Sequence, residues 1–531
     1  MANKVSLVIL SVSLFSLVSC SNVLIVPLVG EGSHYYIMLK LGRELMDRGH
    51  NITMLLADRY QPLITSSQNP TERAINYIYF PSLFKLDDYH YLQASMTEAG
   101  LQGRYVQWLM EIHAMGAENI FMQLYDECRD VLGNQTILST LRDLNFDISV
   151  ADVNGFCPVF QYLRQYNRIP YVAVSAIITI PSSSLLTTRT PTNPAYKPEM
   201  SSGFDHVMSF SERIINFAAS IFYLILFNQA TDPSKELRVQ HGLDSSLFCE
   251  DAELFLINTN FALDFPRPLM PNTRTVGGIT TGPGRPLAVE WIEFLESAGE
   301  DGVVLFSMGS NANGIDEDIS GLFAGAFAQL SQKVIWKLNG KPSATVTPNV
   351  KVVDWIPQND LLGHPQIKAF VYHCGMNGVW EAVYHGVPMV AVPLFADQSD
   401  NAQRLVSRGM AVKVDITTLT SDELAQAIRT VIRDPSYKSN ATRISAIFRD
   451  SPRTPTEEAV DWIEYVIRHN GAKHLRSAAL DLNIFQYLLL DVIAVLLLAF
   501  IAFMIILYCS CRLCFRGCKR LYSGSSKIKS E

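Results

Sequence analysis

The sequence predicts an α/β protein with two Rossmann-like domains that face a cleft, followed by one C-terminal transmembrane helix. The chain has 531 residues, which is too long for one ordinary hydrophobic core. Two successions of short, continuous apolar runs alternate with helical patterns, as is typical of parallel sheets covered by helices. Between them, PRPLMPNTRTVGGITTGPGRP is rich in proline and glycine and is interpreted as an interdomain linker.

Each succession supplies apolar runs that we expect to be strands. Those of the first domain are NVLIVPL (22–28), NITMLLA (51–57), FDISVADV (146–153), YVAVSA (171–176) and LFLINTN (254–260). Those of the second domain are VVLFSMGS (303–310), KVIWKL (333–338), VKVVDWI (350–356), KAFVYH (368–373) and PMVAVPLF (388–395). The predicted domains are residues 21–270 and 271–450, and a helical segment, 451–490, leads to the membrane.

Both ends of the chain indicate a membrane protein. Residues 1–20 carry one lysine and then an apolar run, the pattern of a secretory signal peptide. The predicted transmembrane helix, 491–509, carries an apolar run, 492–509, that is long enough to cross a bilayer. The tail, 510–531, has six basic residues and one acid, so the positive-inside rule places it in the cytosol. We expect a single-pass type I protein whose domains face the lumen.

The last residues, KIKSE, resemble the dilysine signal that returns membrane proteins to the endoplasmic reticulum. A merely basic tail is the alternative. The sequence therefore predicts the endoplasmic reticulum membrane as the location. The lipid bilayer is one predicted partner.

Composition excludes some classes of function. The net charge of −8 disfavours nucleic-acid binding. The cysteines are too scattered to give a disulfide framework. Asn134 and Asn440 lie in glycosylation sequons that are expected in surface loops.

One segment does not fit a plain core helix. The segment 214–227, IINFAASIFYLILF, is apolar nearly all round. It could line a pocket, lie on the membrane or form a buried core helix.

Three kinds of site could be formed by the stretch VYHCGMNGVWEA (371–382): a diphosphate site, a Cys–His nucleophile or a metal site. A strand ends at His373, and a helix begins near Asn377, so amides at its positive end could bind a diphosphate. A Cys–His nucleophile is less attractive because adjacent strand residues point to opposite faces, and a zinc site lacks a second pair of ligands. From these residues alone, a phosphate site and a structural turn remain open.

The flanks of this stretch resemble a known family. The segment DWIPQNDLLGHPQIKAFVYHCGMNGVWEAVYHGVPMVAVPLFADQSDNAQRL (354–405) is similar to the donor-binding signature of the UDP-glycosyltransferases, which include the UDP-glucuronosyltransferases. RGHNITML, FDISVAD, DFPRPLMPN and SAGEDGVVLFSMGS extend the similarity along the chain. The resemblance implies a fold of the GT-B type and a UDP-sugar as co-substrate.

The resemblance also implies roles for residues of the second domain. Trp355 would stack on the uracil ring, while Gln358 and Glu381 would bind the uridine portion. The diphosphate would be held by Ser310, His373, Asn377 and Gly378, and hydroxyls of the transferred sugar by Asp397 and Gln398. Two positions depart from the family pattern: Tyr372 replaces a Thr or Ser, and Cys374 replaces a Gly or Ala. These departures put donor affinity in doubt.

An acid–base pair is expected in the first domain. His34 follows the first strand and Asp152 ends a later one, and the carboxyl ends of strands are where sites form in open α/β sheets. A lone histidine there is more often structural, but the family places its catalytic histidine and supporting aspartate at these positions. Histidine can accept the proton of an acceptor hydroxyl near neutral pH.

The predicted function is inverting transfer of a sugar, glucuronate or glucose, to small lipophilic acceptors. No cofactor and no metal are expected. Asp316, Glu317 and Asp318 match a metal-binding Asp-X-Asp pattern, but they open a predicted helix, where acids favour the positive end. The alternatives are a UDP-glucosyltransferase and a non-catalytic lumenal binding protein of the same fold. A homo-oligomer is left open.

Overall fold

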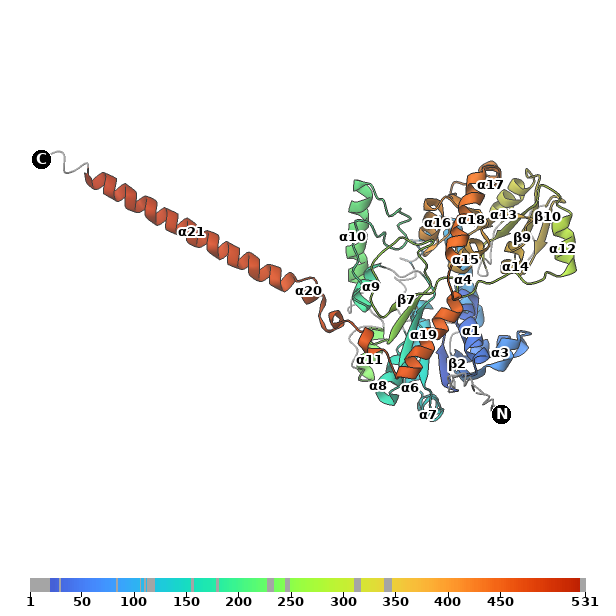
Figure 1. Cartoon of the computed structure of the whole chain (residues 1–531), viewed down its shortest axis with the longest axis horizontal. Helices are drawn as coiled ribbons and strands as arrows, with labels where there is room; N and C mark the ends of the chain where they lie inside the picture. The colour runs from blue at the N-terminus through green and yellow to red at the C-terminus, as the bar shows by residue number, and fades with distance from the viewer. Residues whose placement is uncertain are drawn as a thin grey trace, which may run out of the picture. The chain divides into compact units, whose positions relative to one another are not determined.

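A computed structural model of the chain describes residues 20–27, 30–82, 85–105, 107–108, 111, 120–153, 157–177, 181–226, 234–243, 249–309, 317–338 and 346–525 (Figure 1). Nearly all of the predicted signal peptide, Ser310, Asp316 and both lysines of KIKSE lie outside the described residues. The chain forms two compact units, Met1–Arg476 and Ser477–Glu531, and each is described by itself.

The first domain is built on a seven-stranded sheet in the order β3-β2-β1-β4-β5-β6-β7. Every neighbouring pair of strands is parallel, as predicted. The apolar runs do not predict β3 or β7, and the linker interpretation is wrong for the residues of β7, which form an edge strand. The strands are β1 (Asn22–Val26), β2 (Asn51–Ala57), β3 (Asn76–Phe80), β4 (Ile148–Asp152), β5 (Tyr171–Ser175), β6 (Leu254–Ile257) and β7 (Thr273–Thr275).

The second domain has a six-stranded sheet in the order β10-β9-β8-β11-β12-β13. It is also parallel throughout. The apolar runs predict all of its strands except β13, which has only one buried residue. The strands are β8 (Val303–Ser307), β9 (Lys333–Lys337), β10 (Val350–Val353), β11 (Ile367–Tyr372), β12 (Met389–Ala391) and β13 (Ala411–Lys413).

Helices cover both faces of each sheet. In β1, Val23 and Ile25 belong to one apolar cluster, whereas Leu24 and Val26 belong to another, as side-chain alternation requires. The helices of the first domain are α1 (Gly32–Asp47), η1 (Asp58–Tyr60), α2 (Gln61–Ser66), α3 (Pro70–Ala74), α4 (Leu86–Leu101), α6 (Ile120–Gly133), α7 (Gln135–Asp143), α8 (Val159–Asn167), α9 (Pro181–Thr187), α10 (Phe210–Leu226) and α11 (Ser234–Gln240). Those of the second are α12 (Val289–Glu296), α13 (Glu317–Phe327), α14 (Gln358–Leu362), α15 (Met376–His385), α16 (Gln398–Ser407), α17 (Ser421–Arg433) and α18 (Pro435–Arg449).

Each sheet reverses its strand order at one place. In the first sheet the reversal lies between β1 and β4, and in the second between β8 and β11. Ligands of open α/β sheets bind in the crevice at such a point, beyond the carboxyl ends of the strands. The predicted residues that follow β1, β4 and β11 are therefore placed where this topology forms sites.

Helix α19 (Pro455–His469) follows the second domain in the chain but packs on the first. Ala459, Val460, Ile463 and Val466 are fully buried in the same apolar cluster as β1 and α1. Figure 1 shows α19 beside α1. The sequence predicts this region only as a segment leading to the membrane, whereas its first helix completes the core of the first domain; η4 (Lys473–Leu475) follows it.

Helix α10 presents its apolar side chains to the outside. Phe210, Ile214 and Ile225 are 72%, 55% and 65% exposed, whereas Asn216 and Ser220 are buried. The buried Asn216 amide donates to the carbonyl oxygens of Pro194 and Lys197. The alternative of a buried core helix is therefore wrong, because the polar residues hold this helix to the protein and its apolar face is left exposed.

Local structure adds a disulfide that the sequence does not predict and corrects the expectation for one glycosylation sequon. Cys128 and Cys157 form a disulfide with a Cα–Cα distance of 5.4 Å. Asn440 lies inside α18 and its side chain donates to the carbonyl of Gly409, so the expected surface loop is wrong there. Asp434 caps this helix and Pro435 opens it, which is a strong start signal.

The second unit contains η5 (Ala478–Asp481), α20 (Ile484–Tyr487) and α21 (Leu490–Ser525). Within α21, the candidate span Leu490–Arg520 includes an 18-residue stretch with a mean hydropathy of 3.1. In the part of the chain that the structure describes, this is the one helix long and apolar enough to cross a membrane. The predicted transmembrane segment, 491–509, lies inside it.

Candidate active site

The structure brings His34 and Asp152 together. His34 lies in the first turn of α1, directly after β1, and Asp152 is the last residue of β4, the neighbour of β1. The distance from His34 Nδ1 to Asp152 Oδ2 is 2.6 Å. The Asp152 side chain is 1% exposed and that of His34 is 22% exposed. A buried carboxylate thus orients an imidazole that can still reach solvent or substrate.

The same pair sets the protonation behaviour of His34. Burial lowers the pKa of the imidazole, but the charge and hydrogen bond of Asp152 outweigh burial, and the pKa is raised above its ordinary value. Because a carboxylate accepts hydrogen bonds, the proton is assigned to Nδ1 and the lone pair to Nε2. Nε2 is therefore the atom that can accept a proton from a substrate.

Gln358 and Glu381 form the second close pair. Gln358 opens α14, Glu381 lies in α15, and Gln358 Nε2 donates to Glu381 Oε2 over 2.6 Å. Burial, reinforced by the charge of Asp360 and opposed by Gln358, raises the pKa of Glu381 to about 7. Its carboxylate can accept from two hydroxyl groups at once, as neighbouring ribose hydroxyls require.

His373 lies between two glycines. A Cβ atom would lie 2.5 Å from its ring at Gly309, and 2.5 Å from its Nε2 at Gly375, so only glycine fits at either position. Burial and the charge of Lys337 lower the pKa of His373 to about 3, which keeps the ring neutral. Its buried Nδ1 makes no hydrogen bond to the described residues. A neutral imidazole can donate one hydrogen bond to a phosphate.

The N-terminus of α15 follows directly. Its N-cap, Gly375, provides no side-chain hydrogen bond, so amides of the first turn remain available to an anion. Cys374 is fully buried with a φ of 67°, and its thiol donates to the carbonyl of Tyr372 over 3.6 Å. Burial raises the pKa of this thiol. Cys374 is therefore part of the packing under the turn.

Asn377 connects the two domains. Its side-chain amide donates to the carbonyl of Ser33 over 3.1 Å, across 344 residues of sequence. Ser33 precedes His34, so this bond ties the beginning of α15 to the turn that carries His34. The sequence predicts Asn377 as a diphosphate ligand, and it does not indicate this contact.

Asp397 and Gln398 lie at the beginning of α16. The Asp397 carboxylate accepts from Asn401 over 2.8 Å, and burial raises its pKa. Gln398 Oε1 accepts from the amides of Leu394 and Phe395, so its amide nitrogen is the group it can offer to a sugar. Trp355 is 69% exposed, which leaves room for a nucleobase to stack on its indole ring.

Electrostatics link the two halves of this site. The charge of Asp397 raises the pKa of His34, and the imidazole in turn lowers the pKa of Asp397 against the larger effect of burial. The His34–Asp152 pair of the first domain and the Asp397 carboxylate of the second therefore act on each other. Ser310 lies outside the described residues.

Sequence reasoning misses several residues of the site. Lys337 ends β9 and its Nζ donates to the carbonyl of Gly309 over 2.8 Å; a lysine at the end of an apolar run is the signal that could have indicated it. Asp400 accepts from the amides of Ser201 and Gly203 over 2.7 and 2.8 Å. No pattern in the sequence indicates that this pairing holds α16 against the first domain.

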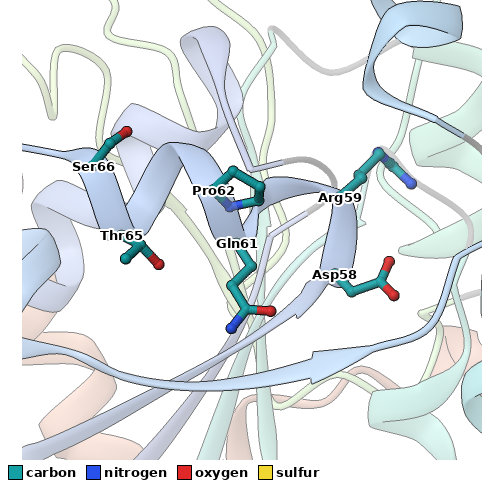
Figure 2. Close-up of a pocket in the computed structure, with 6 residues that line it drawn as sticks. All are labelled: Asp58, Arg59, Gln61, Pro62, Thr65 and Ser66. Atoms are coloured by element: carbon teal, nitrogen blue, oxygen red, sulfur yellow. The ribbon is translucent and has the colours of Figure 1, made fainter.

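Two features lie apart from this site. Glu317 and Asp318 are in the first turn of α13, the position expected for acids at a helix start. A hollow of about 580 Å³ is lined by residues of η1 and α2: Asp58, Arg59, Gln61, Pro62, Thr65 and Ser66. Figure 2 shows these six side chains. None of them is a predicted site residue, and we assign the hollow no role.

Solved structures define the class of this protein. Os79 from O. sativa aligns with a TM-score of 0.56 at 18% identity, covering 84% of this chain and 100% of that one. The calicheamicin glycosyltransferase CalG4 aligns with a TM-score of 0.53 at 20% identity, covering 85% and 99%. The fold is that of the GT-B glycosyltransferases, as predicted.

Sequence comparisons define the family. The model described as UDP-glucoronosyl and UDP-glucosyl transferase matches residues 21–523. UDP-glucuronosyltransferase 2A3 of Cavia porcellus is 37% identical over 522 residues, 96% of each chain. UDP-glucuronosyltransferase 2A2 of Homo sapiens is 36% identical over 534 residues, 99% of this chain and 98% of that one. The chain belongs to the UDP-glycosyltransferase family and is a membrane-anchored enzyme of that family.

Proposed function

We propose that this enzyme transfers a sugar from a UDP-sugar to a hydroxyl group of small lipophilic acceptors, with inversion at the anomeric carbon. The observation that carries the proposal is the His34–Asp152 pair at 2.6 Å, electrostatically coupled to Asp397 of the other domain. A base and a sugar-binding carboxylate that act on each other are what a transfer between two bound substrates needs.

The proposed reaction is a single displacement. His34 Nε2 accepts the proton of the acceptor hydroxyl, and Asp152 stabilises the resulting imidazolium. The acceptor oxygen forms a bond to the anomeric carbon while the bond from that carbon to the UDP oxygen breaks. UDP leaves with the bonding electron pair, and no covalent enzyme intermediate forms.

Charge on the departing UDP is proposed to be neutralised by the protein itself. The first-turn amides of α15 and the imidazole of His373 are placed for hydrogen bonds to a diphosphate. Lys337 adds a positive charge close to His373. We infer that the UDP-sugar is a co-substrate and that no further cofactor and no metal are needed; adding a chelator should leave turnover unchanged.

We propose that UDP-glucuronate, rather than UDP-glucose, is the sugar donor. The support is the 36–37% identity to UDP-glucuronosyltransferases over almost the whole chain. A donor panel tests this choice: membranes containing the protein are incubated with each radiolabelled UDP-sugar and a phenol. Conjugates from UDP-glucose alone would favour the glucosyltransferase alternative, and none from any donor would favour a non-catalytic binding protein.

We propose the endoplasmic reticulum membrane as the location, with both domains in the lumen. The apolar helix α21 supports the anchor, and the exposed apolar face of α10 fits contact with lipid. Such placement suits acceptors that partition into the bilayer. The double change Lys527→Ser and Lys529→Ser should let the protein leave this compartment, which is measured by processing of its N-linked glycans. Unchanged processing would contradict the retrieval signal.

A further inference from the structure

A buried carboxylate of the first domain faces helix α16 of the second. Asp264 lies between β6 and β7, and its side chain is fully buried. Its own segment holds both carboxylate oxygens: Thr259 and Arg267 donate to Oδ2, and the amide of Phe265 donates to Oδ1 over 2.8 Å. The carboxylate is therefore fixed to the first domain independently of α16.

One arginine of α16 reaches this carboxylate. Arg404 Nε donates to Asp264 Oδ1 over 2.7 Å, and the Arg404 side chain is 6% exposed. Burial raises the pKa of Asp264, but the charges of Lys197, Arg404 and Arg267 outweigh burial and hold that pKa well below its ordinary value. Because arginine stays protonated in proteins, both partners are charged. The pair joins the two domains across 140 residues of sequence.

The same arginine continues toward the crevice. Its Nη1 donates to Asn401 Oδ1 over 3.4 Å, and Asn401 is fully buried. The amide nitrogen of Asn401 donates to Asp397 Oδ2 over 2.8 Å and to the carbonyl of Cys374, just before α15, over 3.0 Å. Hydrogen bonds thus run without a break from the first domain to the Asp397 carboxylate. We call Asp264, Arg404, Asn401 and Asp397 the interdomain network.

Stability alone does not account for this network. A buried ion pair can often be replaced by well-packed apolar residues without loss of stability, because two charges must be removed from water. Other contacts already hold α16 to the first domain: Arg408 donates to the carbonyls of Leu263 and Asp264 over 3.1 and 2.8 Å, and Asp400 accepts from two backbone amides. What the interdomain network adds is a fixed place for one carboxylate of the candidate site.

We propose that the Asp264–Arg404 pair positions the transferred sugar, because it fixes the Asp397 carboxylate relative to the first domain. The inference rests on the proposed function, in which Asp397 accepts from sugar hydroxyls and His34 activates the acceptor. Since Asp264 belongs to the same domain as His34, the network sets the sugar at a defined distance from the base, as a displacement between two bound substrates requires. The uridine-binding pair of α14 and α15 is not part of the network, so binding of UDP alone should not depend on it.

The test compares Arg404→Lys with a matched control, Arg408→Lys, in the full-length protein. Lysine keeps a positive charge beside Asp264, but one ammonium group does not reproduce the directed hydrogen bonds of a guanidinium. Arg408 is the C-cap of α16 and contacts the same segment of the first domain, but it is not a member of the interdomain network.

UDP, UDP-glucuronate and UDP-glucose are each titrated by calorimetry. We expect Arg404→Lys to weaken the binding of the donor UDP-sugar about tenfold, the effect of losing one hydrogen bond to a charged group. Its affinity for UDP should stay within about twofold of the wild type, and Arg408→Lys should leave both affinities within that range. Asn401→Ala keeps the ion pair and breaks the next link, so it should reproduce the selective loss.

Kinetics and a double-mutant cycle separate positioning from stability. Arg404→Lys should raise KM for the UDP-sugar but not KM for the acceptor, and it should have little further effect in an Asp397→Ala background, because the arginine acts through that carboxylate. An unchanged UDP-sugar affinity, equal losses for UDP and UDP-sugar, full additivity with Asp397→Ala, or variants at both positions that do not fold would each overturn the proposal. If the wild-type protein binds no UDP-sugar, the proposed function fails instead.

Discussion

The two domains have the same sheet topology at their ligand crevices but equip them with different chemistry. At the reversal of the first sheet, the Asp152 carboxylate, whose side chain is 1% exposed, holds a histidine with a raised pKa. Next to the reversal of the second sheet, the first-turn amides of α15 and His373 follow β11, and burial and Lys337 lower the pKa of this histidine to about 3. The first arrangement favours binding a proton and the second favours remaining neutral beside an anion.

This difference shows how one topology serves two tasks. An imidazole becomes a base when a buried carboxylate compensates the charge that it acquires. The imidazole of His373, next to Lys337 and two glycines, stays uncharged and can offer one N–H as a hydrogen-bond donor. The residues around each histidine, and not its place in the fold, therefore set its protonation.

The largest expected effect is the loss of the base. His34→Ala should lower turnover about 10²–10⁴-fold while leaving UDP binding nearly intact, because the nucleotide residues lie in the other domain. Turnover and UDP affinity are measured on the same preparation. His469→Ala, at an exposed position of α19, is the control and should leave turnover and UDP affinity unchanged. If His34→Ala kept the turnover of the wild type, His34 would not be the general base.

Asp152→Asn should have a smaller effect with a distinct signature. The base remains, so we expect a loss of about 10²-fold, the lower end for general-base catalysis. His34 must be neutral to accept a proton, so wild-type turnover rises with pH through a pKa above the ordinary value of 6.5. Removing the carboxylate lowers that pKa, and the rising limb of the pH profile should move to lower pH.

The pH profile distinguishes this role from a structural one. If Asp152 only supported folding, Asp152→Asn would lower activity without moving the limb. In a His34→Ala background, Asp152→Asn should add no further loss, because the carboxylate acts through the imidazole. Full additivity of the two losses would break the proposed pairing.

Glu381 tests the other side of the comparison. Glu381→Ala should weaken UDP binding by about 1–3 kcal/mol, because the ribose hydroxyls lose a charged acceptor. Turnover at saturating donor should change less than affinity. Glu290→Ala, an exposed acid in α12, is the matched control. Equal affinities for the two variants would contradict the assignment of Glu381 to the ribose.

The pKa of Glu381 adds a dependence on pH. Burial raises it to about 7, so the carboxylate is protonated in part of the population at neutral pH. A ligand that needs the charged form binds more tightly as pH rises, so the affinity for UDP should increase from pH 6 to pH 8. Glu381→Gln cannot ionise and should show a flat profile in calorimetric titrations.

Much of the fold could be predicted because its strands are continuous buried apolar runs. β3 escaped prediction because none of its residues is fully buried, and β7 because it has only three residues. The apolar spacing of Ala459, Val460 and Ile463 indicates a helix, but periodicity does not say which sheet the helix covers. These residues pack on the first domain because the chain comes back to that domain after it has formed the second.

The candidate site likewise has features that local sequence predicts and features that depend on tertiary packing. Short motifs at strand ends predict where a site forms, because strand ends of open sheets form sites, and the resemblance to the family supplies the roles of their residues. The contact of Asn377 with Ser33 and that of Asp400 with Ser201 join distant segments, and no local pattern encodes such pairings. The direction in which Tyr372 points likewise depends on space beneath a helix, which only tertiary packing defines.

The smallest expected effect is that of Cys374→Gly. Cys374 has a φ of 67°, a conformation that glycine adopts without strain and that costs other residues about 1 kcal/mol. Relief of this strain offsets the loss of the buried thiol, so turnover should be retained or improved. Cys249→Gly is the matched control, since Cys249 is also buried and has a φ of 65° but lies in the first domain. Both variants should bind UDP and turn over like the wild type, with similar small changes in Tm. A catalytic or zinc-binding cysteine predicts instead that Cys374→Gly alone is inactive or loses bound metal, which turnover assays and metal analysis by mass spectrometry detect.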